Sequence, residues 1–210
     1  MKKILAILLC LCMVLAVVAC NQTGETEETT AETTTAADDT KVEETEAEYK
    51  LGMGVVVSTE SSSSATAEKA GTAQIDATVA AVVLDNAGKI VACRLDAVQN
   101  KITVAADGTL TVPTTFKTKM ELGDNYNMAK YGASMDWNKD GVVKEWYLQS
   151  EAFSKYVVGK TAAEVEAMAT QVVEGAGYVI SADADLLAAG CTIQITAIKT
   201  VVAKSVTNAR

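Results

Sequence analysis

The stretch TVAAVVLDNAGKIVACRLDA, residues 78–97, decides the fold. It holds two apolar runs in which every second residue can face the same side, and the polar sequence DNAG at 85–88 separates them. A period of two is typical of β-strands, and Asp, Asn and Gly are favoured in tight turns. The stretch therefore predicts an antiparallel hairpin with strands at 73–84 and 90–97.

Similar alternation on both sides of this hairpin predicts further strands at 51–59, 101–104 and 109–112. In the first of these, Leu, Met and Val residues share one face, and Gly52 and Gly54 lie on the other. Pro113 ends the last one, because proline cannot donate a backbone hydrogen bond to a sheet. The order of the runs indicates an antiparallel sheet whose sequential strands are neighbours.

Helical spacing appears later in the chain. Trp146, Phe153 and Val157 lie on one stripe and predict a helix at 143–157 that Gly159 ends. The capping-box sequence at 161–164 opens a second helix that reaches residue 172. We also expect a strand at 191–197 and a C-terminal helix at 198–206. Strands followed by helices indicate an α+β domain, with an antiparallel sheet and helices packed on one face.

The segment 114–141 shows no sustained period, yet it contains Phe116, Tyr126, Tyr131 and Trp137. Long irregular segments in compact domains are usually functional or mobile. Two interpretations follow. The segment covers a bound ligand, or its aromatic side chains fill the edge of the sheet.

The N-terminus has the features of an export signal at 1–19. Lys2 and Lys3 precede an apolar run of 16 residues at 4–19, which is shorter than the roughly 20 residues of a comfortable membrane span. Cys20 directly follows Val-Val-Ala, which resembles a bacterial lipobox, and in that pattern its thiol carries a diacylglyceryl group. The alternative is an ordinary signal peptide with an incidental Cys20. The lipobox predicts a protein exported and anchored to the outer face of the cell membrane.

Residues 20–48 follow as a tether. From residue 21 they contain ten acidic residues and one lysine, and most of the others are Thr or Ala. Such a segment repels itself and has little apolar surface to bury, so we expect it to be disordered. Residues 49–210 form a single globular domain of nearly neutral charge, although the whole chain carries −9. Without clustered Lys and Arg, nucleic acid is not an expected partner.

The chain contains no histidine. This excludes Ser-His-Asp and Cys-His catalysis and every zinc site that uses imidazole. No catalytic residue is evident, so we favour a binding or interaction module over an enzyme.

Asp136, Asn138, Asp140 and Gly141 match the opening of a calcium-binding EF-hand loop. The twelfth position of the loop is Tyr147 instead of the bidentate Glu. The same residue types also suit a polar turn before a helix.

Cys93 and Cys191 are the two cysteines of the expected domain. A disulfide is chemically possible in an exported protein. Cys93 lies on the apolar side of its expected strand, however, and a buried thiol packs as a small hydrophobe. We therefore favour two buried thiols over a bridge.

Four short sequences carry a resemblance to a known family: DNAGKIV at 85–91, ELGDNY at 121–126, KEWYLQ at 144–149 and VGKT at 158–161. With them the chain resembles clostridial-type membrane lipoproteins related to FMN-binding-domain proteins. In that family, a pattern Asp-x-x-Ser/Thr-Gly-Ala-Thr/Ser takes FMN through a phosphoester bond. Gly132, Ala133 and Ser134 match the end of the pattern, while Met128 and Tyr131 replace its acid and its first hydroxyl residue.

The sequence thus predicts a cell-surface lipoprotein that acts as an extracytoplasmic ligand-binding or interaction module. Its expected partners are the membrane, through the lipid on Cys20, and a small molecule or a cell-envelope protein. The resemblance implies an alternative, a flavin-carrying electron-transfer protein with FMN on Ser134.

Overall fold

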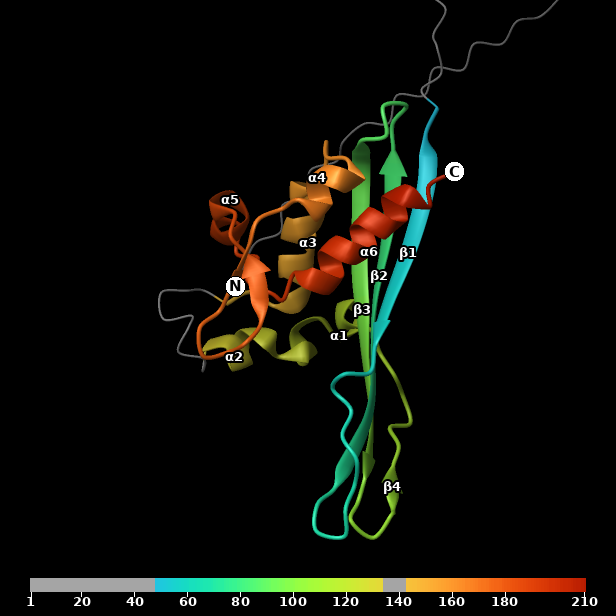
Figure 1. Cartoon of the computed structure of the whole chain (residues 1–210), viewed down its shortest axis with the longest axis vertical. Coiled ribbons are helices and arrows are strands. Elements are labelled where there is room, and N and C mark those ends of the chain that lie inside the picture. Colours follow the sequence, from blue (N-terminus) through green and yellow to red (C-terminus); the bar gives the residue numbers. More distant parts are fainter. Residues whose placement is uncertain (1–47, 134–142) are drawn as a thin grey trace, which may run out of the picture. The chain divides into compact units, whose positions relative to one another are not determined.

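The predicted hairpin is the centre of the fold. The computed structural model describes residues 48–133 and 143–210. Its main sheet is antiparallel and has the strand order β1-β2-β3-β4 (Figure 1). The strand bounds are β1 Lys50–Ser58, β2 Gly71–Leu84, β3 Ile90–Val104 and β4 Leu110–Thr111. The Asp85 carboxylate closes the β2–β3 turn by accepting hydrogen bonds from the N–H groups of Ala87 and Lys89, both at 2.9 Å.

Strand β3 is longer than predicted, because it continues through residues 98–100 between the two expected strands. Two of these three side chains, Gln99 and Asn100, are polar. The backbone nevertheless stays paired with β2, with Gln99 opposite Asp76 and Lys101 opposite Gln74. Backbone pairing with β2 therefore sets the length of β3, whereas the prediction depended on side-chain hydrophobicity.

Helices α3 and α6 lie on one face of the sheet, α3 along β3 and α6 across β1 and β2 (Figure 1). The predicted α+β class, with helices on one face of an antiparallel sheet, is confirmed. The helical bounds are α1 Lys119–Leu122, η1 Gly123–Tyr126, α2 Met128–Ala133, α3 Trp146–Tyr156, α4 Ala162–Glu166, α5 Ala184–Ala188 and α6 Thr196–Thr207.

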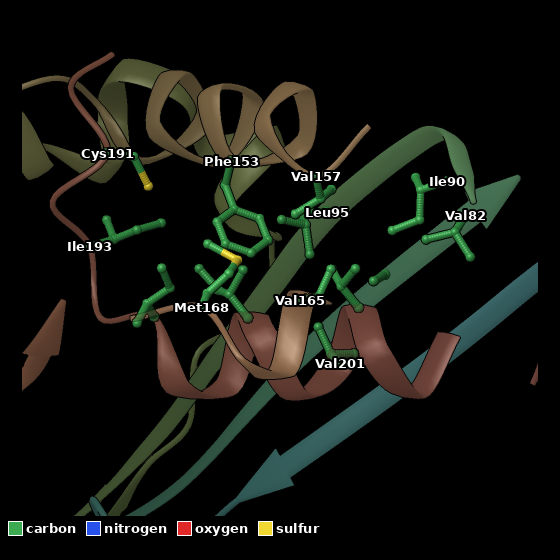
Figure 2. Packing of buried hydrophobic residues seen from close by; sticks show 14 of the residues in the cluster. Val82, Ile90, Leu95, Phe153, Val157, Val165, Met168, Cys191, Ile193 and Val201 are labelled. Atoms are coloured by element: carbon green, nitrogen blue, oxygen red, sulfur yellow. The ribbon is translucent and has the colours of Figure 1, made fainter. Parts of the chain in front are cut away.

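The core fills the space between this face of the sheet and helices α3, α4 and α6. Figure 2 shows Phe153 of α3 close to Leu95 of β3, with Val165 and Val201 completing the layer from α4 and α6. These four side chains are at most 2% exposed. Residues 45–210 form one compact unit, and the buried apolar cluster comes from residues 80–202. The unit therefore contains its own core and has what it needs to fold alone.

Helix α6 approaches β1 closely at two glycines. A Cβ atom on Gly52 would lie 2.0 Å from the backbone oxygen of Ser205, and one on Gly54 would lie 2.8 Å from the Ser205 hydroxyl. That hydroxyl is 2.7 Å from Val201 O and 3.0 Å from Ala80 O. The glycine face of β1 is thus the buried face, and its Leu, Met and Val face is exposed.

The C-terminal end of the chain covers the outer edge of β1. The backbone of Leu51 forms two hydrogen bonds with the backbone of Arg210, at 3.1 and 3.2 Å. Asn208 Nδ2 donates to Met53 O at 3.0 Å, and Lys204 Nζ donates to Val55 O at 2.9 Å. Four backbone groups of an otherwise open edge are therefore occupied, which protects the edge against pairing with another strand.

Two predictions for the C-terminal half are wrong. The capping box of Thr161 and Glu164 is present, but helix α4 ends at Glu166, and a small second sheet follows, with β5 Thr170–Val172 and β6 Val179–Ser181. Residues 191–197 do not form a strand, and α6 already begins at Thr196. Ile193 and Ile195 are both buried, so the alternation reflects an extended segment packed on the core. This segment shares one backbone hydrogen bond with β6, from the N–H of Ile195 to Val179 O at 2.9 Å, but it is not a strand of either sheet.

Candidate functional site

Along β2, the side chains on the helix-facing side of the sheet change from apolar to polar. Leu84, Val82 and Ala80 are buried in the core, and the next residues on the same face are Thr78 and Asp76. A groove of about 1160 Å³ opens where these polar residues begin. Its walls come from the segment around α1 and α2, from the start of α3, and from residues 192–200.

Lys119 is the first residue of α1 and lies in this groove. The α1 capping box fixes its position, since Thr118 Oγ1 accepts the N–H of Glu121 at 3.1 Å and the Glu121 carboxylate accepts the N–H of Thr118 at 2.8 Å. Lys119 Nζ lies 4.7 Å from the centroid of the Tyr126 ring and 5.5 Å from that of Trp146. Both distances are within the range of cation–π attraction. Within residues 48–133 and 143–210, no carboxylate forms an ion pair with this ammonium group.

Tyr126 links the wall of the groove to its floor. It is the last residue of η1, and its hydroxyl donates a hydrogen bond to Gln99 Oε1 of β3 at 3.1 Å. This bond holds the ring beside the sheet, where it can contact both Lys119 and a ligand above Gln99. Two aromatic residues of the segment 114–141, Tyr126 and Tyr131, thus line the groove, and the covering of a ligand by this segment stays a prediction.

Gln149 of α3 holds three segments of the groove together. The side chain is 1% exposed. Its Nε2 donates to Lys144 O at 2.6 Å and lies 3.4 Å from Met128 Sδ, and its Oε1 accepts the N–H of Thr192 at 2.7 Å. A buried amide with all these partners fixes the start of α3, α2 and the segment at 192 relative to one another.

The Glu145 carboxylate fixes the start of α2. It accepts the backbone N–H groups of Met128 at 2.8 Å and Ala129 at 3.2 Å. These are groups that a helix leaves without internal partners, and a negative charge is favourable there. Met128 and Tyr131 of α2 consequently stand in the wall of the groove.

The opposite wall includes Tyr178, Ile193, Thr196 and Thr200. Burial raises the pKa of Tyr178, so its hydroxyl stays protonated and can donate a hydrogen bond at neutral pH. Asp76 on the floor already accepts two hydrogen bonds from Gln74 Nε2, at 2.9 and 3.0 Å. The groove thus combines aromatic walls with one cation, Lys119, and two carboxylates, Asp76 and Glu60. A small ligand with a ring suits the aromatic walls, and an anionic group on it would have to lie at Lys119, away from the carboxylates.

The residues matched to the flavin pattern are only partly described. Gly132 lines the groove and is buried in α2. A Cβ atom there would lie 2.4 Å from Val143 Cγ1, so close packing accounts for the glycine. Ala133 ends α2, and Ser134 lies outside the described residues.

The calcium candidates Asp136, Asn138 and Asp140 lie outside the described residues, as do Cys20 and the tether up to residue 47. In the part of the chain that is described, no three His, Cys, Asp or Glu side chains are grouped as a metal site requires. Among the described helices, none is long and apolar enough to cross a lipid bilayer.

Cys93 and Cys191 are free thiols, as we favoured, but only Cys191 is buried, and Cys93 is half-buried. Burial raises the pKa of Cys93 to about 11 and that of Cys191 to about 12. Both therefore stay protonated at neutral pH, and neither has the low pKa of a reactive cysteine.

Lys119, Gln99 and Gln149 are site residues that the sequence did not predict. The capping sequence Thr118-Lys119-Met120-Glu121 was the available signal, since it marks the start of a helix inside the segment treated as irregular. Nothing local marks Gln149, whose partner Thr192 is 43 residues away.

Comparisons with protein-family models, with curated proteins and with solved structures gave no match.

Proposed function

We propose that this protein is a lipid-anchored module on the outer face of the cell membrane, and that it binds a small molecule in the groove. The observation that carries the binding role is the Lys119 ammonium, which lies within cation–π distance of the Tyr126 and Trp146 rings and has no ion pair among the described residues. The export signal, Cys20 and the acidic tether support the location.

The ligand we propose carries a flat ring and a negative charge. The charge is drawn to Lys119, whose three N–H donors can bind a carboxylate or a phosphate. The ring stacks on Tyr126, and polar substituents meet Thr78, Asp76 and Gln99 on the floor. This arrangement needs binding only, without a nucleophile or a general base.

Fluorescence of Trp146 provides the test. The chain has two tryptophans, Trp137 and Trp146, so Trp137→Phe in residues 45–210 leaves one emitter, in the wall of the groove. Two pairs of probes share a ring and differ in a phosphate: FMN with riboflavin, and phenyl phosphate with phenol. We expect the phosphate-bearing member of a pair to quench Trp146 with an affinity about tenfold higher, the value of one charge-assisted hydrogen bond.

Lys119→Met should abolish this preference, because it removes the charge and keeps a side chain of similar length. Lys117→Met is the matched control, since Lys117 is exposed and outside the groove, and it should keep the preference. Equal binding of both members of each pair, or an effect of Lys117→Met as large as that of Lys119→Met, would contradict the proposed site.

The anchor is tested separately in cells that export the chain. Cys20→Ser should release the protein from the membrane fraction into the soluble exported fraction, because no thiol remains to carry the lipid. Mass spectrometry of the wild-type protein should find a diacylglyceryl group on Cys20, whereas unmodified Cys20 would exclude the anchor. An FMN mass on Ser134 in the same spectrum would favour the flavin-carrying alternative.

A further inference from the structure

The face of the sheet opposite the helices carries an apolar surface without a partner in the described residues. We call it the outer patch and define it by residues that share this face on β1 and β2: Leu51, Met53, Val55, Val57 and Ile75. Their side chains are between 37% and 66% exposed. The pairing of β1 with β2 continues the surface across the sheet, because Met53 lies opposite Ala81 and Val55 opposite Val79.

The outer patch is large for a surface that stays in contact with water. The five side chains expose on the order of 500 Å² of apolar area, at the upper end of what soluble monomers leave in one patch. No ionisable side chain interrupts it on β1 or β2, since the residues on this face at 51–57 of β1 and 75–83 of β2 are Leu, Met, Val, Ile and Ala. On β3, Arg94 and Asp96 pair with Ala81 and Val79, so two charged residues border the patch on the same face. Such a surface favours an apolar partner.

The covered edge of β1 excludes one kind of contact, the addition of a partner strand to the sheet. Arg210, Asn208 and Lys204 occupy backbone groups along that edge, so a partner strand cannot extend the sheet there without displacing them. The open face has no such cover. Two sheets commonly pack face to face about 10 Å apart, with the side chains of both faces interdigitating.

We propose that the outer patch is the interface of a symmetric dimer, in which the open face of one sheet packs against the same face of a second copy. Two such patches together bury roughly 1,000 Å², the lower limit for a specific interface. The nearly neutral charge of residues 49–210 keeps electrostatic repulsion between copies weak. Of the outer patch, only Val57 also lines the groove, so the dimer leaves most of the groove open.

Sedimentation equilibrium of residues 45–210 tests this proposal. An interface at the lower limit of size predicts a weak dimer that forms reversibly as the protein concentration rises toward roughly 1 mM. Met53→Glu should raise the dissociation constant more than tenfold, because it introduces a charge into each half of the interface. Val172→Glu is the matched control, since Val172 is 68% exposed on β5, outside the outer patch. It should leave the dissociation constant unchanged.

Methyl NMR during dilution of the wild-type unit tests the same interface without a substitution. Shifts should change at Leu51, Met53, Val55, Val57 and Ile75 and remain constant at Val172. A protein that stays monomeric at roughly 1 mM would overturn the proposal. So would shift changes centred outside the outer patch. A monomer that co-sediments with phosphatidylcholine vesicles, and loses this property with Met53→Glu, would assign the patch to a lipid surface instead.

Discussion

Gly52→Ala should destabilise the fold by about 2–3 kcal/mol, although alanine is normally the better residue in a strand. The new Cβ atom would lie 2.0 Å from Ser205 O and 3.1 Å from Ala209 Cβ, so the end of α6 must move outward by more than 1 Å. Overpacking of this kind costs about 1–3 kcal/mol. Loss of the 3.0 Å hydrogen bond from Ser205 to Ala80 O adds about 1 kcal/mol. The smaller backbone entropy of the unfolded alanine chain offsets about 0.5–1 kcal/mol.

Urea unfolding of residues 45–210, followed by circular dichroism at low protein concentration, measures this effect. Gly54→Ala should cost less, about 1–2 kcal/mol, because its Cβ atom would lie 2.8 Å from both the Ser205 hydroxyl and Val201 O, contacts less severe than the 2.0 Å contact at Gly52. Lys50→Ala on the same strand is the control, since Lys50 is exposed, and it should change stability by less than about 0.5 kcal/mol. An unfolding midpoint for Gly52→Ala equal to that of the wild type would refute the close contact between α6 and β1.

Three further predictions concern side chains away from these glycines. Gln149→Leu leaves the N–H of Thr192 and the carbonyl of Lys144 without their partner, so urea unfolding should show a loss of about 2–4 kcal/mol, and an unchanged midpoint would contradict the role of Gln149. The hydrogen bond to Asp183 raises the pKa of Tyr156 to about 12, so its stabilisation is complete below pH about 10 and is lost as the pH approaches 12. The same bond lowers the pKa of Asp183, so that stabilisation is present above the ordinary aspartate pKa of about 4 and is lost in acid. Stability measured against pH should therefore fall more steeply at both ends in the wild type than in Tyr156→Phe, and parallel curves would contradict the coupling. Finally, with thiol pKa values raised to about 11 and about 12 by burial, Cys93 and Cys191 should react with Ellman's reagent at pH 8 far more slowly in native protein than in urea, and comparable rates would show that they are accessible.

The elements that the sequence predicted well are those whose signals are local. The β2–β3 turn depends on the Asp85 carboxylate and on Gly88, whose φ is +75°, and both lie within four residues of each other. The capping box that starts α4 likewise spans residues 161–164. Such signals can be recognised in one sequence because all the interacting groups belong to one short segment.

The groove could not be predicted, because it depends on contacts between distant segments. Tyr126 reaches Gln99 across 27 residues, and Gln149 reaches Thr192 across 43. The same limit explains the wrong strand at 191–197. Its alternating burial is real, but whether an extended segment becomes a strand depends on a neighbour that offers free backbone groups, and here the N–H of Thr192 is bonded to a side chain.

Strand β1 combines a local signal with a distant one. Its alternation predicts a strand, but the local sequence does not show which face is buried. The larger side chains would normally face the core. Here the space above β1 is taken by α6, whose Ser205 backbone lies so close that only glycine fits beneath it. Leu51, Met53 and Val55 are therefore turned outward, where they remain exposed. The close packing of α6 thus creates the outer patch. The proposed dimer buries the apolar side chains of β1 that cannot face the core beneath the helix.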